Sequence, residues 1–360
     1  MTTGKDVTIY DIAEELGISA STVSRALKDH PHVKPELKKK ILAIAKRLGY
    51  QQNKFASNLR QRRTHTIGVV IPRLDSYFMS TVISGMEKVA NQAGYQLIIS
   101  QSQESAQKEV ANINTLYNSR IDGLLISLSY ETQSLEHLSI LFRKGIPVVF
   151  FDRVCDHPKC KSVVINNFKA GYEATEHLIN QGCKRIVHLG GSMLRNVYSE
   201  RYKGYIQALM DHGIKPDKNL IIYSDLSRQS GEEVARQMLD WKKLPDGVFA
   251  ANDTSAVSLI CELKKNGVKI PEEVAVVGFN NDPISSVVEP HLTTIHYPGR
   301  EMGEIAAGSL INLLTNRQSE ILSTIILSHS LIIRESSARL GKSSSKSQSE
   351  ARKKGALTSD

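Results

Sequence analysis

Two patterns of apolar positions divide the chain. Over residues 8–50, apolar residues recur every three or four positions, which predicts short amphipathic helices. From residue 65 onward, short runs rich in isoleucine and valine alternate with amphipathic stretches. The apolar runs fit buried strands of a parallel sheet, and the stretches between them fit crossover helices. The pattern therefore predicts a small helical unit followed by a larger α/β region.

The first unit carries the signals of three helices. "TIYDIAEELG" begins with a capping pair, Thr8 and Asp11, and stops at Gly17. Ser19 can cap the next helix, and the third helix begins in "KPELKKK" with a proline near its N-terminus. The inward positions of the second and third helices are Val23, Ala26, Leu27, Leu37, Ile41, Ile44 and Leu48. Three short helices with a tight turn between the first two predict a helix-turn-helix unit.

The α/β region contains more strands than one compact sheet usually holds. The expected strands are "TIGVVIP", "YQLIIS", "DGLLIS", "IPVVFF", "RIVHLG", "GVFAAN" and "VAVVGF". We therefore expect two lobes. The predicted organisation is a helix-turn-helix domain over 1–52, a linker or marginal helix over 53–64, a two-lobed region over 65–338 and a disordered Ser/Lys-rich tail over 339–360.

The net charge of +9 is unevenly distributed. Residues 1–63 hold 13 Lys and Arg against 6 Asp and Glu, whereas the part between this head and the tail is close to neutral. A basic head points to a polyanion such as DNA, although a merely solvated surface would have the same charge. The exposed face of the second helix favours DNA as the partner. Its small residues allow close approach, and Arg25 can donate two hydrogen bonds to guanine.

Several other classes are disfavoured. Four cysteines in 360 residues do not make a disulfide framework, and Cys155, His157 and Cys160 lack a second pair of metal ligands, so no metal site is expected. No apolar run has the length of a membrane span, and no signal peptide is present, so a cytoplasmic protein is expected. Phosphate-loop, zinc-protease and serine-hydrolase motifs are absent, so we expect neither an enzyme nor a cofactor.

The motifs together resemble the lactose-repressor (LacI/GalR) family of bacterial transcription regulators. The resemblance rests on "VTIYDIAEELGISASTVSRAL", "LGYQQNKFASNLR", "TIGVVIP", "NNFKAGYEATEHLI", "RYKGY", "AANDTSAVSLI", "VAVVGFNN" and "LTTIH", and it covers roughly residues 6–336. It implies a helix-turn-helix headpiece and a hinge helix that folds on DNA. It also implies a two-lobed core like periplasmic sugar-binding proteins, and a homodimer that binds palindromic operator DNA at the bacterial nucleoid.

The resemblance also implies which residues contact DNA. The matching headpiece positions are Tyr10, Ala20, Ser21, Thr22, Ser24, Arg25, Lys28 and His32. Ala20 and Ser21 occupy the pair that sets operator specificity, and Lys28 replaces an asparagine, which favours a phosphate contact. In the hinge, Ala56 and Leu59 match, and Leu59 would enter the minor groove and kink the duplex.

An effector site between the lobes is implied in the same way, at Tyr77, Phe78, Arg195, Arg201, Leu226, Asn252 and Asn280. Asn280 replaces the aspartate usual in sugar binders, and residues 165–167 lack an acidic residue common near there. These two missing carboxylates make a plain monosaccharide less expected and leave an anionic or substituted sugar open. Tyr77 and Phe78 fit either a stacking surface or core positions.

The function expected is a sequence-specific transcriptional regulator controlled by a carbohydrate-related effector. Two alternatives remain open from the sequence: the same regulator controlled by a partner protein, and a carbohydrate-binding module or enzyme with a vestigial headpiece. Without a heptad pattern at the C-terminus, we expect a dimer and no tetramer.

Overall fold

A computed structural model describes residues 7–27, 29–50, 63–158, 160–316 and 324–339. The chain forms two compact units, residues 1–64 and residues 65–360, which we call the headpiece and the core. Lys28, Ala56 and Leu59, most of the predicted hinge and nearly all of the predicted tail lie outside the described residues.

The headpiece contains the three predicted helices, α1 (Ile9–Leu16), α2 (Ala20–Leu27) and α3 (Pro35–Arg47). The backbone N–H and the hydroxyl of Thr8 both donate to the Asp11 carboxylate, at 2.6 and 2.7 Å, and α1 ends at Gly17 with a left-handed backbone. The buried residues of this unit are Ile12, Ala13, Val23, Ala26, Ile41 and Ala45. The predicted helix-turn-helix unit is thus confirmed.

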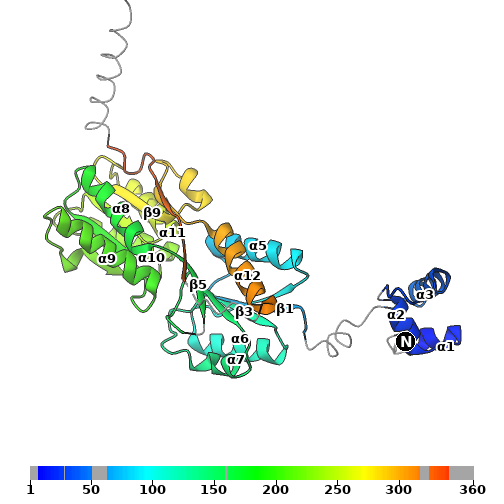
Figure 1. Cartoon of the computed structure of the whole chain (residues 1–360). Helices are drawn as coiled ribbons and strands as arrows, with labels where there is room; N and C mark the ends of the chain where they lie inside the picture. Colours follow the sequence, from blue (N-terminus) through cyan, green and yellow to red (C-terminus); the bar gives the residue numbers. More distant parts are fainter. Residues whose placement is uncertain (1–6, 28, 51–62, 159, 317–323, 340–360) are drawn as a thin grey trace, which may run out of the picture. The chain divides into compact units, whose positions relative to one another are not determined.

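The core contains two six-stranded sheets, one in each lobe (Figure 1). The first-lobe sheet has the order β11-β5-β4-β3-β1-β2 and is parallel throughout. Its strands are β1 (Thr66–Ile71), β2 (Gln96–Gln101), β3 (Gly123–Ile126), β4 (Val148–Phe151), β5 (Lys161–Ile165) and β11 (Thr324–Leu327). All four strands predicted here are present. β2, however, is an exposed edge strand and not a buried one, with Ile98 and Ile99 about 40% exposed.

The second-lobe sheet has the order β12-β10-β9-β8-β6-β7, and only β12 runs antiparallel to its neighbour. Its strands are β6 (Ile186–Gly190), β7 (Ile221–Tyr223), β8 (Gly247–Ala250), β9 (Ala275–Asn280), β10 (Thr293–His296) and β12 (Ser330–Ile332). The three strands predicted for this region are again present. The expected two-lobed α/β core is therefore confirmed.

Helices cover the faces of both sheets. In the first lobe these are α5 (Tyr77–Gln92), α6 (Ala106–Asn118), α7 (Ser139–Arg143) and α12 (Gly299–Thr315). In the second lobe they are α8 (Asn167–Asn180), α9 (Asn196–Asp211), α10 (Arg228–Leu239) and α11 (Asp253–Lys265). Short 3₁₀ helices occupy Glu136–Leu138, Lys218–Leu220 and Pro283–Ser286. Helices that are far apart in the sequence can lie side by side: α12 (orange) packs along α5 (cyan) (Figure 1).

Within the described residues of the core, the chain passes between the lobes three times. β5 precedes α8, β10 precedes α12, and β11 precedes β12, and in each case the two elements belong to different lobes. The carboxyl ends of the parallel strands in both sheets therefore face a shared region beside these crossovers, where ligands of α/β proteins usually bind.

Candidate functional site

The exposed face of α2 carries the headpiece candidates. Ser21 and Arg25 are exposed, whereas Ala20, Thr22 and Ser24 are half-buried. Tyr10 on α1 is 69% exposed, and His32 in the turn before α3 is also exposed. All the predicted DNA-contacting residues that the structure describes therefore lie wholly or partly on the surface.

The hydroxyl cluster at the start of α2 has a local role as well. The Ser19 hydroxyl lies 2.9 Å from the hydroxyls of both Ser21 and Thr22, and it accepts the Thr22 backbone N–H at 3.3 Å. These bonds cap the helix and hold the three side chains together. Ser24 lies one turn further along α2, so the hydroxyl-rich sequence combines a helix cap with an exposed polar face.

A cavity of about 510 Å³ lies between the lobes of the core. Residues from both lobes line it, mostly from loops after strands and from the first turns of α5, α9 and α11. Six of the seven predicted effector residues are among them: Tyr77, Phe78, Arg201, Leu226, Asn252 and Asn280. The volume and the position between two lobes suit a small-molecule ligand.

Arg201 on α9 is the most enclosed cation of this cavity, with only 3% of its surface exposed. Its Nε donates to the Asn167 side chain at 2.9 Å and its Nη1 donates to the Ala251 carbonyl at 2.8 Å. The guanidinium carbon lies 3.4 Å from the centre of the Phe279 ring. Burial lowers the pKa of Arg201, and the nearby Asp152 carboxylate acts in the opposite direction.

Close helix packing fixes the position of Arg201. A side chain at Gly171 of α8 would lie 2.3 Å from the Arg201 carbonyl oxygen, and one at Gly204 of α9 would lie 2.1 Å from the Phe168 carbonyl. Only glycine allows these backbones to approach so closely. The motifs "NNFKAGYEATEHLI" and "RYKGY" are therefore paired in space, and together they place Arg201 at the cavity.

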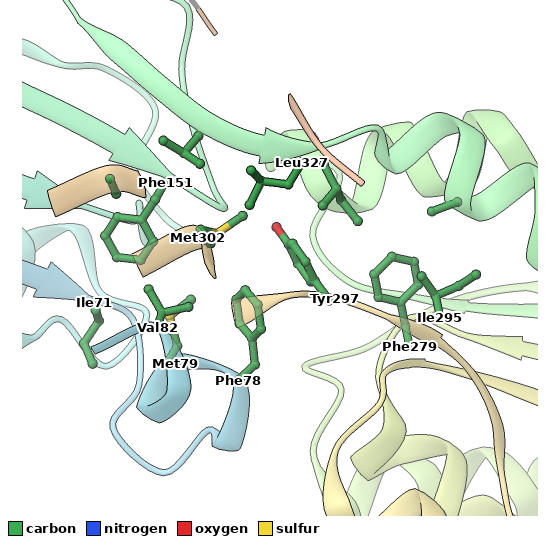
Figure 2. Packing of buried hydrophobic residues seen from close by; sticks show 14 of the residues in the cluster. Ile71, Phe78, Met79, Val82, Phe151, Phe279, Ile295, Tyr297, Met302 and Leu327 are labelled. Atoms are coloured by element: carbon green, nitrogen blue, oxygen red, sulfur yellow. The ribbon is translucent and has the colours of Figure 1, made fainter. Parts of the chain in front are cut away.

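An aromatic stack connects the lobes at the second crossover (Figure 2). The Tyr297 ring is stacked on Phe78 of α5 at 4.2 Å between ring centres, and it meets Phe279 of β9 edge-on at 6.0 Å. The Tyr297 hydroxyl donates to Asp152 at 2.8 Å. Burial raises the pKa of both groups. Phe78 is therefore mainly a packing residue, whereas Tyr77, which is 51% exposed, presents its ring at the cavity.

Arg153 and Glu104 form an ion pair in the cavity wall that the sequence did not reveal. Arg153 Nη1 lies 2.9 and 2.7 Å from the two Glu104 carboxylate oxygens, and the guanidinium lies over the Tyr130 ring at 4.3 Å. Its Nη2 donates to the Tyr198 hydroxyl at 3.1 Å. Arg153 lies two residues after the end of β4, a position at which chemistry-bearing residues of parallel sheets gather.

Arg195 does not line the cavity, in contrast to the role that the family resemblance implies. Its guanidinium donates to the Thr132 carbonyl of the first lobe, and its side chain is buried. The neighbouring Asn196 accepts the Val154 N–H at 2.9 Å and donates to the Asp152 carbonyl at 3.1 Å. With the Tyr130 hydroxyl donating to Tyr198 at 2.9 Å, these contacts join the start of α9 to the first lobe.

The cavity is richer in carboxylates than the sequence suggested. Although Asn280 and residues 165–167 supply none, the lining contains five: Asp75, Glu104, Asp152, Asp225 and Asp282. Asp282 is two residues after Asn280, whose amide lies 3.5 Å from it, and burial raises the pKa of Asp282 to about 6. Other chain segments therefore provide the carboxylates that Asn280 and residues 165–167 do not.

Leu226 and Asn252 line the cavity, but their main contacts are within the protein. Leu226 is buried with a left-handed backbone, and its carbonyl accepts the Asn252 amide at 2.9 Å. The other end of the Asn252 side chain caps α11 by accepting the Ser255 N–H at 2.9 Å. Most of the hydrogen-bonding capacity of Asn252 is used within the protein.

Among the residues that the structure describes, the cysteine cluster over residues 155–160 does not form a metal site. Cys160 lies 3.6 Å from the His157 ring, whereas Cys155 is exposed. Within the described ranges, no group of three His, Cys, Asp or Glu side chains has an arrangement that would hold a metal ion. None of the helices in the described part of the chain is both long enough and apolar enough to span a membrane.

Comparisons with known proteins extend this picture. Residues 8–53 match the family model for bacterial regulatory proteins of the lacI family, and residues 64–335 match periplasmic binding proteins and the sugar binding domain of the LacI family. Catabolite control protein A of Priestia megaterium is 30% identical over 332 residues, covering 92% of this chain and 99% of the relative. The regulator RegA of Clostridium saccharobutylicum is 35% identical, covering 91% and 98%.

Solved structures agree with these matches. The lac repressor dimer bound to operator and the anti-inducer ONPF has a TM-score of 0.83 at 25% identity, covering 93% of this chain and all of that one. The complex of the regulator CelR with cellobiose has a TM-score of 0.70 at 28% identity, covering 92% and 99%. Both the family matches and the structural likeness extend over the headpiece and the core.

Proposed function

The chain belongs to the LacI family of DNA-binding transcriptional regulators with an effector-binding core, and we propose that a carbohydrate-related small molecule bound between its lobes controls operator binding. The cavity between the lobes is the observation that carries this proposal. Its lining combines aromatic rings, carboxylates and arginines from both lobes, and such mixed lining suits the hydroxyls and the apolar faces of a sugar. A ligand there contacts both lobes and favours one angle between them.

We propose that α2 reads the operator with Ala20, Ser21, Ser24 and Arg25 at base edges. Tyr10, Thr22, Lys28 and His32 would contact the backbone, and Ala56 and Leu59 would act in the minor groove. The exposure of the described headpiece residues among these supports the assignment. The structural likeness to an operator-bound repressor dimer supports it too.

We propose a homodimer on a palindromic operator, acting at the nucleoid in the bacterial cytoplasm. The apolar residues exposed on the outer edge strands support a subunit contact through both lobes. Ile98 and Ile99 on β2 are about 40% exposed, and Tyr223 on β7 is 52% exposed. An unpaired, apolar strand edge readily associates with a second chain.

The test begins with the DNA sequence that the full-length protein selects from a random pool. Operator titrations with and without neutral sugars then follow. We expect a large ratio of specific to nonspecific affinity and a 5–150-fold shift by the effector, a coupling of about 1–3 kcal/mol. A selective operator that responds to no sugar, but responds to a cell extract depleted of small molecules, would favour control by a partner protein. Binding of sugar without any selected operator would favour a carbohydrate-binding module.

A further inference from the structure

The charges around the cavity are unevenly compensated. Four arginines and five carboxylates line it. Arg73 binds Asp75 with two hydrogen bonds of 2.9 and 2.7 Å, Arg153 binds Glu104, and Arg228 binds Glu232 at 3.0 Å. Three of the four cations are therefore already neutralised by the protein itself.

The fourth cation and two carboxylates differ from these pairs. Arg201 uses two of its nitrogens on neutral partners, with Asp152 close enough to act on its pKa. Asp225 and Asp282 take part in no ion pair within 4.0 Å anywhere in the described part of the core. A ligand entering the cavity thus meets two carboxylates that accept hydrogen bonds and one buried guanidinium, Arg201, that is already bound to neutral partners.

Glu104 is the carboxylate bound to Arg153, and the backbone holds it in place. Gln103 and Glu104 are successive non-glycine residues with φ angles of 51° and 63°, a conformation that side chains with a Cβ seldom adopt. The Glu104 carboxylate also accepts the Tyr130 N–H at 3.0 Å. The backbone conformation and this hydrogen bond together hold the carboxylate beside Arg153. Arg153 is 7% exposed and lies in the wall of the cavity.

We propose that Glu104 is a specificity-determining residue, which makes the site select an uncharged polyhydroxyl effector and reject its phosphorylated form. Without Glu104, Arg153 would keep the Asp152 carboxylate 4.0 Å from its Nε and the Tyr198 hydroxyl at its Nη2, but its Nη1 would be released to donate to a phosphate. With Glu104, Arg153 is neutralised, and an anion would add its charge to those of Asp225 and Asp282. This inference rests on the proposed function, because it concerns the same cavity and a carbohydrate-related ligand.

The test uses the full-length protein and isothermal titration calorimetry. The probes are neutral mono- and disaccharides and the 6-phosphate esters of the same sugars. We expect the wild-type protein to bind a neutral sugar at least about tenfold more tightly than its ester. Glu104→Gln keeps the side-chain volume and an acceptor for the Tyr130 N–H, and it should reduce this preference by about tenfold.

Two further variants separate the explanations. Glu232→Gln makes the same charge change beside Arg228, whose side chain is 82% exposed, and water should screen its effect. The double change Glu104→Gln with Arg153→Gln should restore the preference of the wild type for the neutral sugar, because the released cation is gone. An equal effect of Glu232→Gln, or no restoration in the double variant, would contradict the role of Glu104.

The outcomes for the wild type distinguish this inference from the proposed function. Tighter binding of an ester than of its neutral sugar would overturn the inference and leave a carbohydrate effector in place, even if Glu104→Gln fails to fold. If neither the neutral sugars nor their 6-phosphate esters bind the folded protein, the proposal of a carbohydrate effector is overturned, and the inference falls with it.

Discussion

The headpiece and the core cavity present polar residues in opposite ways. On the headpiece, Arg25 and Ser21 are exposed, and the hydrogen bonds of the α2 hydroxyls join residues two or three positions apart. In the cavity, Arg201 and Arg153 are nearly buried, and their partners come from segments 34–50 positions away. The exposed polar groups of the headpiece are therefore hydrated and accessible to a partner, whereas the polar groups of the cavity are largely organised before a ligand enters.

The largest effect should follow from removing Arg201. Arg201→Ala leaves the Ala251 carbonyl and the Asn167 side chain without their donor, and it leaves Asp152 with less compensating charge. We expect the core to lose about 3–5 kcal/mol of unfolding free energy, as is typical of breaking a buried charged network. Differential scanning calorimetry of the full chain should show a lower transition temperature for the core and an unchanged transition temperature for the headpiece.

The control for Arg201→Ala is Arg228→Ala in the same cavity lining. Its side chain is 82% exposed, so the free energy of unfolding of the core should change by less than about 0.5 kcal/mol. If both variants lower the core transition equally, burial is not what makes Arg201 important, and the contrast between headpiece and cavity would lose its main support.

A second effect concerns the dependence of core stability on pH. Burial raises the pKa of Asp253 to about 7; this side chain accepts the Asp282 N–H at 2.7 Å and the Thr294 hydroxyl at 2.6 Å. A raised pKa means that the folded state holds a proton that the unfolded state releases. This contribution to stability is therefore lost as the pH rises from about 4 to 7.

Asp253→Asn tests this dependence, because it removes the titrating group and nearly preserves the shape. Between pH 5 and pH 7, the free energy of unfolding of the variant should rise by about 2 kcal/mol relative to that of the wild type. The comparison must be relative, since burial lowers the pKa of His188 to about 3, and that group acts in the opposite direction. Chemical denaturation at pH 5, 6 and 7 measures the difference. A constant difference between the two proteins would show that Asp253 does not titrate there.

The same contrast between local and distant contacts explains what the sequence could predict. The headpiece helices follow from spacing and caps such as Thr8 with Asp11, because their determinants lie within one or two turns. Strands β7 and β12 have only three residues each, too short for a periodic signal, and β10 in "LTTIH" is half threonine. The exposure of β2 could not be predicted either, because an edge position depends on strand order.

The cavity was only partly predictable for the same reason. Arg201, Tyr77 and Asn280 follow from the family pattern, and all three line the cavity. Arg153 and Tyr297 gain their importance from contacts across the lobes, which no local pattern encodes. Arg195 shows the opposite case: it lies one residue before α9, where it reaches the first lobe and not the cavity.

A third prediction concerns the headpiece directly. Arg25→Ala should leave folding unchanged because the side chain is exposed, and it should lose about 1–3 kcal/mol of discrimination at one base pair of the operator. Competitive titration with the selected operator and its single-base variants measures this loss. If Arg25→Ala weakens binding to specific and random DNA equally, Arg25 contacts a phosphate and does not recognise a base. Glu14→Ala, on the exposed surface of α1, serves as the folding control.

The smallest effect should come from Asn196, which joins the lobes without lining the cavity. Its amide bonds Val154 and Asp152 across the lobes, so Asn196→Ala should disfavour the joined arrangement by about 1 kcal/mol. Ser199→Ala is the matched control, because the Ser199 hydroxyl donates only within α9, to the Asn196 carbonyl at 3.2 Å. If a ligand joins the lobes, Asn196→Ala should shift effector-free operator affinity about fivefold, in the direction opposite to the effector. Operator titration checks the shift, and small-angle scattering of the ligand-free protein checks the opening. A shift in the same direction as the effector, or an equal shift in Ser199→Ala, would show that the contacts of Asn196 do not set the lobe angle.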